Sequence, residues 1–329
     1  MKTALIFGIT GQDGSFMCDL LLEKGYSVHG VIRRSSNFNT QRLDHVFNKN
    51  PNLYLHYGDI TDTMNTFNII EKTNPDEIYN FSAQSHVKVG SDLENYTFQT
   101  NTLGVLNILQ AVLKVNKNCK VYQAGTSEQY GNVSNSYLDE TSEMKPVSIY
   151  GISKLAARNI CEMYKNTHNM YIVSSILFNH ESERRGDTFV TKKITNYVGK
   201  GDYSKPLQLG NLDSKRDWGY AKDYVEAIFL MMHNTVPTDY VIATGNAYSV
   251  REFAREAFRQ KGITLSFKNH GKSEVALDEF GKVLVQVNEK YYRDIEIDCL
   301  LGNASKAKKE LGWSSSTDLV SLVRTMLNA

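Results

Sequence analysis

The sequence predicts an α/β protein in which helices cover both faces of a doubly wound parallel sheet. Three observations predict this fold. A glycine-rich turn directly follows the first apolar run, strand-like and helix-like stretches alternate regularly through the first half, and a later helix and strand return toward the sheet. Alternation of this kind is typical of βαβ units joined by right-handed crossovers.

The glycine-rich turn spans residues 8–14 and has the sequence Gly-Ile-Thr-Gly-Gln-Asp-Gly. A strand, such a turn and then a helix form the dinucleotide-binding unit of Rossmann-type folds. The glycines let the backbone approach the phosphates, and the start of the helix offers unpaired N–H groups. A tight turn with no ligand is the alternative interpretation.

The strand and helix patterns continue from this turn in order. Apolar runs predict six strands, at residues 3–7, 27–32, 53–57, 77–81, 119–124 and 171–177. Between them, helical periodicity predicts four helices, at residues 14–24, 63–73, 101–115 and 150–166. The spacing therefore predicts a parallel sheet that is covered on both faces.

The remainder of the chain has shorter patterns. Residues 224–233 predict a helix and 239–243 a late strand, and further helices are expected at 250–260, 304–311 and 319–327. Residues 261–288 are polar, with a hairpin expected around Gly281. We expect residues 1–178 to form the nucleotide-binding Rossmann domain, its sheet completed by about residues 220–245. Residues 179–219 and 246–329 should form a smaller C-terminal α/β substrate domain, with the substrate cleft between the two.

Composition and charge exclude several classes of protein. The 329 residues carry a net charge of +1, which gives no electrostatic basis for binding nucleic acid or an anionic membrane. The four cysteines lack metal-ligand spacing, the histidines form no cluster, and no metal site is predicted. With no apolar stretch of membrane-spanning length and no signal peptide expected, a cytoplasmic enzyme is predicted.

Tyr150 and Lys154 are four residues apart on a predicted helix, so both side chains lie on one face. A neighbouring ammonium group is expected to lower the pKa of the phenol from about 10. Together with a dinucleotide site, such an acid–base pair indicates redox chemistry at a carbon that bears a hydroxyl. An ordinary helix surface is the alternative.

The choice of cofactor is predicted from the end of the second strand. NAD-binding folds place an acidic residue there for the ribose 2′-hydroxyl, whereas this chain has Arg33 and Arg34. A guanidinium group suits a 2′-phosphate, which favours NADP. Asp59, after the third strand, could accept a hydrogen bond from the adenine amino group or could be a turn residue.

Several motifs together resemble the extended short-chain dehydrogenase/reductases and, within them, the GDP-mannose 4,6-dehydratase family. The resemblance covers nearly the whole chain and rests on the turn at 8–14, the loop at 33–36 and the stretches at 83–88, 126–131, 150–154, 177–182, 209–213, 215–219, 221–225 and 249–253. Departures occur at Glu183, where proline is usual in the family, and at 292–296, where Tyr-Arg-Asp-Ile-Glu replaces a more usual Tyr-Arg-Pro-Thr-Glu.

The resemblance implies the reaction and its catalytic residues. The expected activity is NADP-dependent conversion of GDP-D-mannose to GDP-4-keto-6-deoxy-D-mannose. C4 is oxidised, water leaves across C5 and C6, and the hydride returns to C6. Thr126 and Tyr150 would act at the sugar O4, Lys154 would bind the nicotinamide ribose, and Glu128 would remove the C5 proton and protonate the leaving C6 hydroxyl.

The resemblance also implies binding residues for the two ligands. The residues expected to bind NADP are Gly8, Thr10, Gly11, Gln12, Asp13, Gly14, Arg33, Asp59, Ile60, Phe81, Ser82, Ala83, Gln84, Ser85, Tyr96, Lys154, His180 and Arg185. Those expected to bind the sugar nucleotide are Ser85, Asn179, Lys193, Asn211, Arg216, Arg251, Arg293 and Glu296.

Two other interpretations remain at this stage. An epimerase or a 4-keto reductase on the same fold needs only the hydroxyl, tyrosine and lysine, so Glu128 argues for the dehydratase. A secondary reductase activity stays open. A binding protein without catalysis would be expected to lose Glu128, Tyr150 or Lys154, and all three are present. The long polar loop at 34–42 resembles one that reaches a neighbouring subunit in the family, which predicts a homodimer or homotetramer.

Overall fold

The computed structural model describes residues 1–328 except 37, 134–136 and 293–296. Within these residues, seven parallel strands form the main sheet in the order β10-β6-β5-β4-β1-β2-β3. The strands are β1 (Thr3–Phe7), β2 (Ser27–Ile32), β3 (Leu53–Tyr57), β4 (Glu77–Asn80), β5 (Lys120–Ala124), β6 (Ile172–Leu177) and β10 (Tyr240–Ile242). This confirms the predicted doubly wound α/β fold.

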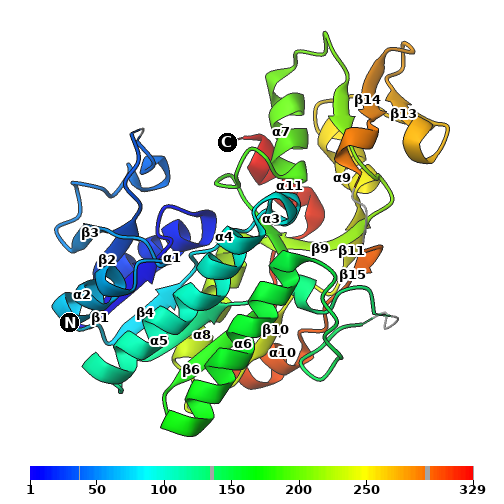
Figure 1. Cartoon of the computed structure of the whole chain (residues 1–329). Coiled ribbons are helices and arrows are strands. Elements are labelled where there is room, and N and C mark those ends of the chain that lie inside the picture. Colours follow the sequence, from blue (N-terminus) through cyan, green and yellow to red (C-terminus); the bar gives the residue numbers. More distant parts are fainter. Residues whose placement is uncertain (37, 134–136, 293–296, 329) are drawn as a thin grey trace.

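Helices cover both faces of this sheet (Figure 1). One face packs against α2 (Thr63–Thr73), α5 (Gly104–Val115) and α6 (Ile149–His168), and the other against α1 (Gln12–Glu23), α8 (Ala221–Met232) and α10 (Ser305–Leu311).

Side chains of β1 alternate between the two cores. Leu5 and Phe7 join the cluster with α2, α5 and α6, whereas Ala4 and Ile6 join the cluster with α1 and α8. All four are buried, because a strand covered on both faces has no solvent side.

A second unit stands above the carboxyl ends of the strands. Its four-stranded sheet has the order β12-β13-β14-β8, formed by β8 (Leu207–Leu209), β12 (Ser266–Lys268), β13 (Val275–Leu277) and β14 (Val283–Val287). It shares a hydrophobic core with α7 (Val190–Lys200), α9 (Val250–Arg259) and α11 (Leu319–Leu327). β13 and β14 pair as the predicted hairpin, and Gly281 has a φ of +83° in its turn.

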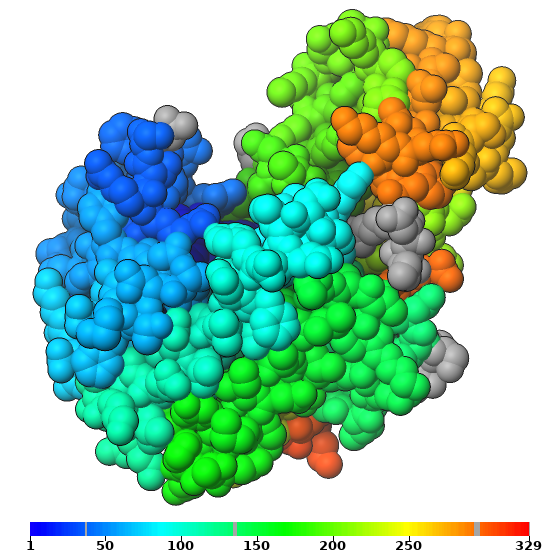
Figure 2. All heavy atoms as spheres, viewed as in Figure 1, coloured from blue at the N-terminus to red at the C-terminus, as the bar shows by residue number. Residues whose placement is uncertain are grey.

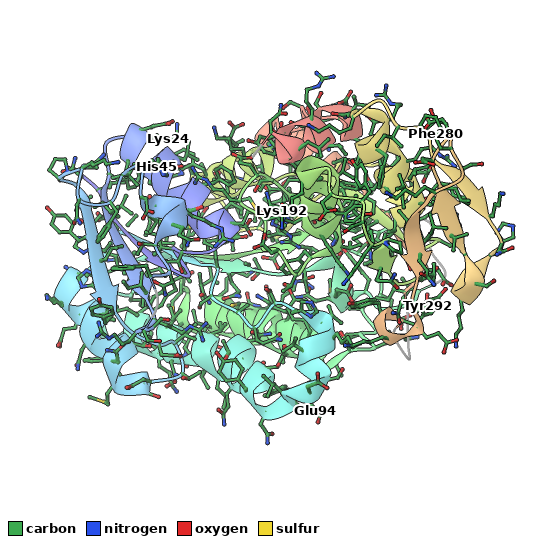
Figure 3. The ribbon with its side chains drawn as sticks, turned by 90° about the horizontal axis from the view of Figure 1, so that it is seen from above. Lys24, His45, Glu94, Lys192, Phe280 and Tyr292 are labelled. Carbon is green, nitrogen blue, oxygen red and sulfur yellow. The ribbon has the colours of Figure 1, made fainter. Side chains whose placement is uncertain are left out.

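A small sheet joins the two units. β9 (Lys215–Tyr220) pairs with β7 (Asn179–Glu181), β11 (Ala247–Ser249) and β15 (Cys299–Leu300). Sequence patterns did not predict these short strands, nor α7, nor the helices α3 (Val87–Asp92) and α4 (Glu94–Phe98) that precede α5. Seen from above, Lys192 of α7 lies between the lobe that carries His45 and the lobe that carries Phe280 and Tyr292 (Figure 3).

Two further findings concern the chain as a whole. In the part of the chain described here, none of the helices is sufficiently long and apolar to span a membrane. Cys18, Cys119, Cys161 and Cys299 are all free thiols, and the first three are buried.

Candidate active site

A cleft of about 1080 Å³ lies between the carboxyl ends of the main sheet and the second unit. Figure 2 shows the molecule hollowed between its blue N-terminal lobe and its green and orange lobe. The lining includes residues that directly follow β1, β2, β3, β4, β5 and β6. Ligands of open α/β sheets bind at this edge.

The glycine-rich turn forms one end of the cleft and has no room for a side chain at Gly8 or Gly14. Gly8 has a φ of +80°, and a Cβ there would lie 2.8 Å from the backbone nitrogen of Ser82. A Cβ on Gly14 would lie 2.3 Å from the carbonyl oxygen of Gly8. Gly11 is the N-cap of α1 and offers no side-chain hydrogen bond to the helix start. The turn therefore presents backbone N–H groups and fits a dinucleotide diphosphate.

Arg33 and Tyr96 join two walls of the cleft. Arg33 Nη1 donates a hydrogen bond to the Tyr96 phenol at 2.7 Å, which connects the end of β2 to α4. Asp59 Oδ1 accepts hydrogen bonds from the backbone N–H (2.9 Å) and hydroxyl (2.8 Å) of Thr61, so the side chain stabilises its own turn. Asp59 nevertheless lines the cleft.

Arg42 is a cleft residue that sequence reasoning missed. Its guanidinium group donates to the carbonyl oxygens of Thr10 (3.1 Å) and Arg184 (2.7 Å). It thus ties the glycine-rich turn to the segment that leaves β7. Its place in a long polar loop is the only sequence signal for this role.

The four predicted catalytic residues line one part of the cleft. Thr126 and Glu128 follow β5, and Tyr150 and Lys154 lie in the first turns of α6. Ser148 caps α6 by accepting a hydrogen bond from Gly151 N (3.0 Å), which starts the helix where the two side chains share a face. Lys154 Nζ donates to the carbonyl oxygen of Ala124 at 2.9 Å.

The pKa of Tyr150 contradicts the expectation drawn from its spacing to Lys154. Burial raises the pKa of Tyr150 to about 12, although a hydrogen bond with Thr126 lowers it, and the Glu128 carboxylate raises it further. Burial also lowers the pKa of Lys154 to about 8, against the attraction of Asp13. Desolvation outweighs the charge pairing that spacing alone suggested.

His180 and Asp13 meet across the cleft floor. His180 Nε2 lies 2.9 Å from Asp13 Oδ2, and Nδ1 lies 2.8 Å from the carbonyl oxygen of Phe178. Gln12 Nε2 donates to the carbonyl oxygen of His180 at 3.1 Å, and Ser182 Oγ donates to Gln12 Oε1 at 2.8 Å. These contacts hold β7 against the start of α1.

Cations line the part of the cleft nearest the second unit. Arg185 forms an ion pair with Glu181 (2.9 Å) and lies over the Phe189 ring. Lys193 Nζ donates to the carbonyl oxygen of Gln208 at 2.5 Å, and Arg216 Nη1 donates to that of Ile297 at 2.8 Å. The positive charge of Lys193 and Arg216 suits a second diphosphate.

Most of the other predicted binding residues also line the cleft. They are Ile60, Phe81, Ser82, Ala83, Ser85, Asn179 and Asn211, together with the turn at 8–14 except Ile9.

Gln84 and Arg251 are not among the lining residues. Gln84 Nε2 donates to the carbonyl oxygen of His86 (3.0 Å). Arg251 donates two hydrogen bonds to Glu274, both of 2.8 Å, and also pairs with Asp213. The predicted residues Arg293 and Glu296 lie outside the described residues.

Several further lining residues were not predicted, among them His86, Phe189 and Tyr291. The rings of His86 and Phe189 meet at a tilt of 47° with centroids 5.7 Å apart, and Lys193 lies over the Tyr291 ring at 3.9 Å. His86 lies within a motif that carried the resemblance, so its position could have been noted. Phe189 and Tyr291 had no such signal. Among the residues that the structure describes, no group of three or more histidine, cysteine or carboxylate side chains could hold a metal ion.

The sequence matches the family described as GDP-mannose 4,6 dehydratase over residues 5–326. The human GDP-mannose 4,6 dehydratase is 48% identical over 100% of this chain and 91% of its own length. The Drosophila melanogaster protein of that name is 47% identical over 100% of the chain and 86% of its length. The GDP-mannose 4,6-dehydratase of Yersinia enterocolitica is 46% identical over 95% and 89%.

Solved structures confirm the fold. The dTDP-glucose 4,6-dehydratase of Bacillus anthracis, in complex with NAD, superposes with a TM-score of 0.82 at 20% identity over 100% of this chain and 96% of that one. RMD from Pseudomonas aeruginosa, complexed with NADPH, gives a TM-score of 0.77 at 17% identity over 100% and 98%. At such identities the likeness concerns the architecture alone.

Proposed function

The chain belongs to the GDP-mannose 4,6-dehydratase family and is a hydro-lyase, and we propose that it converts GDP-D-mannose to GDP-4-keto-6-deoxy-D-mannose with NADP. The observation that carries this proposal is that Glu128 lies in the same cleft as Thr126, Tyr150 and Lys154, near enough to affect the pKa of Tyr150. An epimerase or reductase has no use for a carboxylate there, whereas removal of water from the sugar needs one.

The cleft suits two diphosphate ligands side by side. We assign the dinucleotide to residues 1–178 together with His180 and Arg185, with the diphosphate on the turn at 8–14 and Arg33 at the adenosine end. The sugar nucleotide is assigned to residues 179–219 and 246–329, where Lys193 and Arg216 line the cleft. The cofactor, when bound, supplies a reversible hydride acceptor.

The side chains divide the remaining chemistry among them. Tyr150, hydrogen-bonded to Thr126, accepts the O4 proton as C4 is oxidised. It must be a phenolate for this step, and the positive charges of Lys154 and of an oxidised nicotinamide would lower the pKa that burial raises. A ketone at C4 acidifies the C5 proton, and Glu128 removes it. The same carboxyl then protonates the C6 hydroxyl as water leaves. Tyr150 gives its proton to C5 as the hydride returns to C6, which restores both side chains. Lys154, held by the Ala124 carbonyl, places a positive charge beside the ribose and Tyr150.

The test is incubation of the protein with NADP and a panel of sugar nucleotides, followed by mass spectrometry. Loss of one water from GDP-mannose, with the other sugar nucleotides unchanged, is the expected result. An epimerised product of unchanged mass, or loss of water from a different sugar nucleotide, would contradict the proposal. Selectivity for NADP is tested by binding titrations with both nicotinamide dinucleotides.

We further propose that the protein is a homodimer or homotetramer. Large apolar side chains are exposed along α4, the segment before α5, and α6; they include Phe98 (36% exposed), Leu103 (46%), Ile152 (43%) and Met163 (48%). Such a face is typical of a surface that another chain covers. A monomer by light scattering at micromolar concentration, with full activity, would refute this proposal.

A further inference from the structure

Both ring nitrogens of His180 face oxygen atoms that accept hydrogen bonds. Nδ1 lies 2.8 Å from the carbonyl oxygen of Phe178, and Nε2 lies 2.9 Å from Asp13 Oδ2. A carbonyl oxygen cannot donate, so Nδ1 must carry a hydrogen. A neutral ring has only one N–H, so a second proton must lie between Nε2 and the Asp13 carboxyl. The pair therefore holds one titratable proton.

This proton belongs on the ring rather than on the carboxyl. The ordinary pKa of histidine exceeds that of aspartic acid by about 2.6. Burial lowers the pKa of His180, but the Asp13 carboxylate and the hydrogen bonds outweigh burial and raise it above its ordinary value. Burial raises the pKa of Asp13, yet its net shift is downward because of the His180 charge. The His180 ring also stacks on Tyr224, with centroids 4.7 Å apart, which favours a cationic ring.

Other titratable groups face the pair from each neighbouring element. Arg185 follows β7 and lowers the pKa of both partners, and Gln12 Nε2 donates to Asp13 Oδ1 at 3.0 Å. The charge of Asp13 affects the pKa of Lys154 and Tyr150 of α6 and of Tyr122 of β5. The His180 ring contacts Tyr224 of α8.

The position of the carboxylate makes its charge important. Asp13 lies in the first turn of α1, at the helix start that offers N–H groups to phosphates. A lone carboxylate at this place would repel a diphosphate. With the shared proton the pair is neutral, and without it the pair carries a charge of −1.

We propose that Asp13 and His180 act as a one-proton unit in the cleft floor, and that loss of this proton weakens binding of the dinucleotide diphosphate. Both are positioning residues in this role, because neither need touch the reacting atoms. The inference rests on the proposed function in that the ligand is a nicotinamide dinucleotide. The sign follows from the raised pKa: binding is tight at low pH and weakens as pH rises through the pKa of His180.

The first test needs no ligand. In protein labelled with ¹⁵N-histidine, with the His180 signal assigned from His180→Gln, both ring nitrogens should be mostly protonated at pH 6.5, the ordinary pKa of histidine, because the pKa of His180 is raised. In Asp13→Asn the amide can donate to Nε2, so the hydrogen bonds persist while the ring becomes neutral. A mostly neutral wild-type ring at pH 6.5 would overturn the proposal, and this measurement stands even where Asp13→Asn fails to fold.

The second test measures the Kd of NADP between pH 6 and pH 10. Lys154 also titrates in this pH range. Wild type and the variants all retain Lys154, so a difference between their slopes cannot come from it. The slope of log Kd against pH should be steeper in wild type than in Asp13→Asn, by up to about one log unit per pH unit, which corresponds to one proton. Asp19→Asn makes the same change on the same helix, where Asp19 pairs with Arg184 and His45, and should match wild type.

Equal slopes for wild type and Asp13→Asn would refute the proton unit. This outcome is separable from a failure of the proposed function, because GDP-mannose turnover is not part of either measurement.

Discussion

Lys154 Nζ donates a hydrogen bond to the carbonyl oxygen of Ala124 at 2.9 Å, which anchors the α6 ammonium to the last residue of β5. The side chain is 3% exposed, and its charge has few partners to offset burial. The same burial that fixes the position of the Lys154 ammonium also lowers its pKa.

This arrangement predicts a basic limit to activity. Burial lowers the pKa of Lys154 to about 8, so the ammonium is charged below that pH and loses its proton as pH rises above it. We expect kcat to fall above about pH 8. Lys154→Met should lower kcat on the order of 100-fold or more at pH 7, whereas the exposed Lys117→Met should not. Constant kcat from pH 7 to pH 10 would contradict this prediction.

Arg33 predicts the selectivity between the two dinucleotides. A charge-assisted contact with a 2′-phosphate contributes about 1.5–3 kcal/mol. Arg33→Ala should therefore weaken NADP roughly ten- to over a hundredfold and NAD far less, by calorimetric titration. Tyr96→Phe removes the 2.7 Å hydrogen bond to Arg33 and should have a smaller effect in the same direction. Arg259→Ala, which only breaks an exposed pair with Glu256, is the control. Equal affinity of the wild type for NAD and NADP would refute the assignment.

Glu77 predicts how stability depends on acid. This carboxylate at the start of β4 is 1% exposed and accepts hydrogen bonds from Lys2 (2.9 Å), Tyr26 (3.2 Å) and Tyr79 (2.8 Å). Burial acts to raise its pKa, but His233 and the other hydrogen-bond donors lower it from 4.5 to about 2. A lowered pKa stabilises the fold above about pH 4.5, and this contribution is lost as pH falls toward 2.

Glu77→Gln should therefore lower the free energy of unfolding at pH 7 by roughly 2–3 kcal/mol, as measured with urea. The difference from wild type should shrink as the pH is lowered from 4.5 to 3.5. Glu71→Gln, an exposed change on α2, should have little effect. A difference that stays constant down to pH 3.5 would show that the charge of Glu77 is not the cause.

The main sheet could be predicted because its strands are apolar on both faces. Burial of β1 on two sides requires a continuous apolar run, and such runs are visible in the sequence. β9 could not be predicted, since its sequence Lys-Arg-Asp-Trp-Gly-Tyr is mostly polar. It is a strand because its backbone pairs with β7, β11 and β15, which are distant along the chain. Buried Asp217 also accepts hydrogen bonds from Thr244 (2.7 and 2.9 Å) and Gly245 (2.9 Å).

The site divides in the same way. The spacing of Tyr150 and Lys154 predicted that they share a helix face, but not their pKa values, because spacing says nothing about burial. The contact between Asp13 and His180 joins residues 167 apart. Asp13 and His180 come together because the fold places β7 next to the start of α1. From the sequence alone, the two residues were therefore predicted as separate cofactor contacts.

The path of the hydride gives a sharp test of the reaction sequence. If the hydride removed from C4 returns to C6, GDP-mannose deuterated at C4 should yield product with deuterium at C6. No NADPH should accumulate in the steady state. Mass spectrometry and proton NMR of the product would locate the label. Deuterium lost to solvent would refute the proposed sequence of steps.

The variant Glu128→Gln separates oxidation from elimination. Its amide cannot accept the C5 proton, so C4 oxidation should proceed while loss of water stops. Single-turnover absorbance at the NADPH band should then rise and persist, and dehydration should slow on the order of 100-fold or more. Glu143→Gln, an exposed change of the same charge on the loop before α6, should turn over as the wild type does. Dehydration at the wild-type rate by Glu128→Gln would show that another group removes the C5 proton.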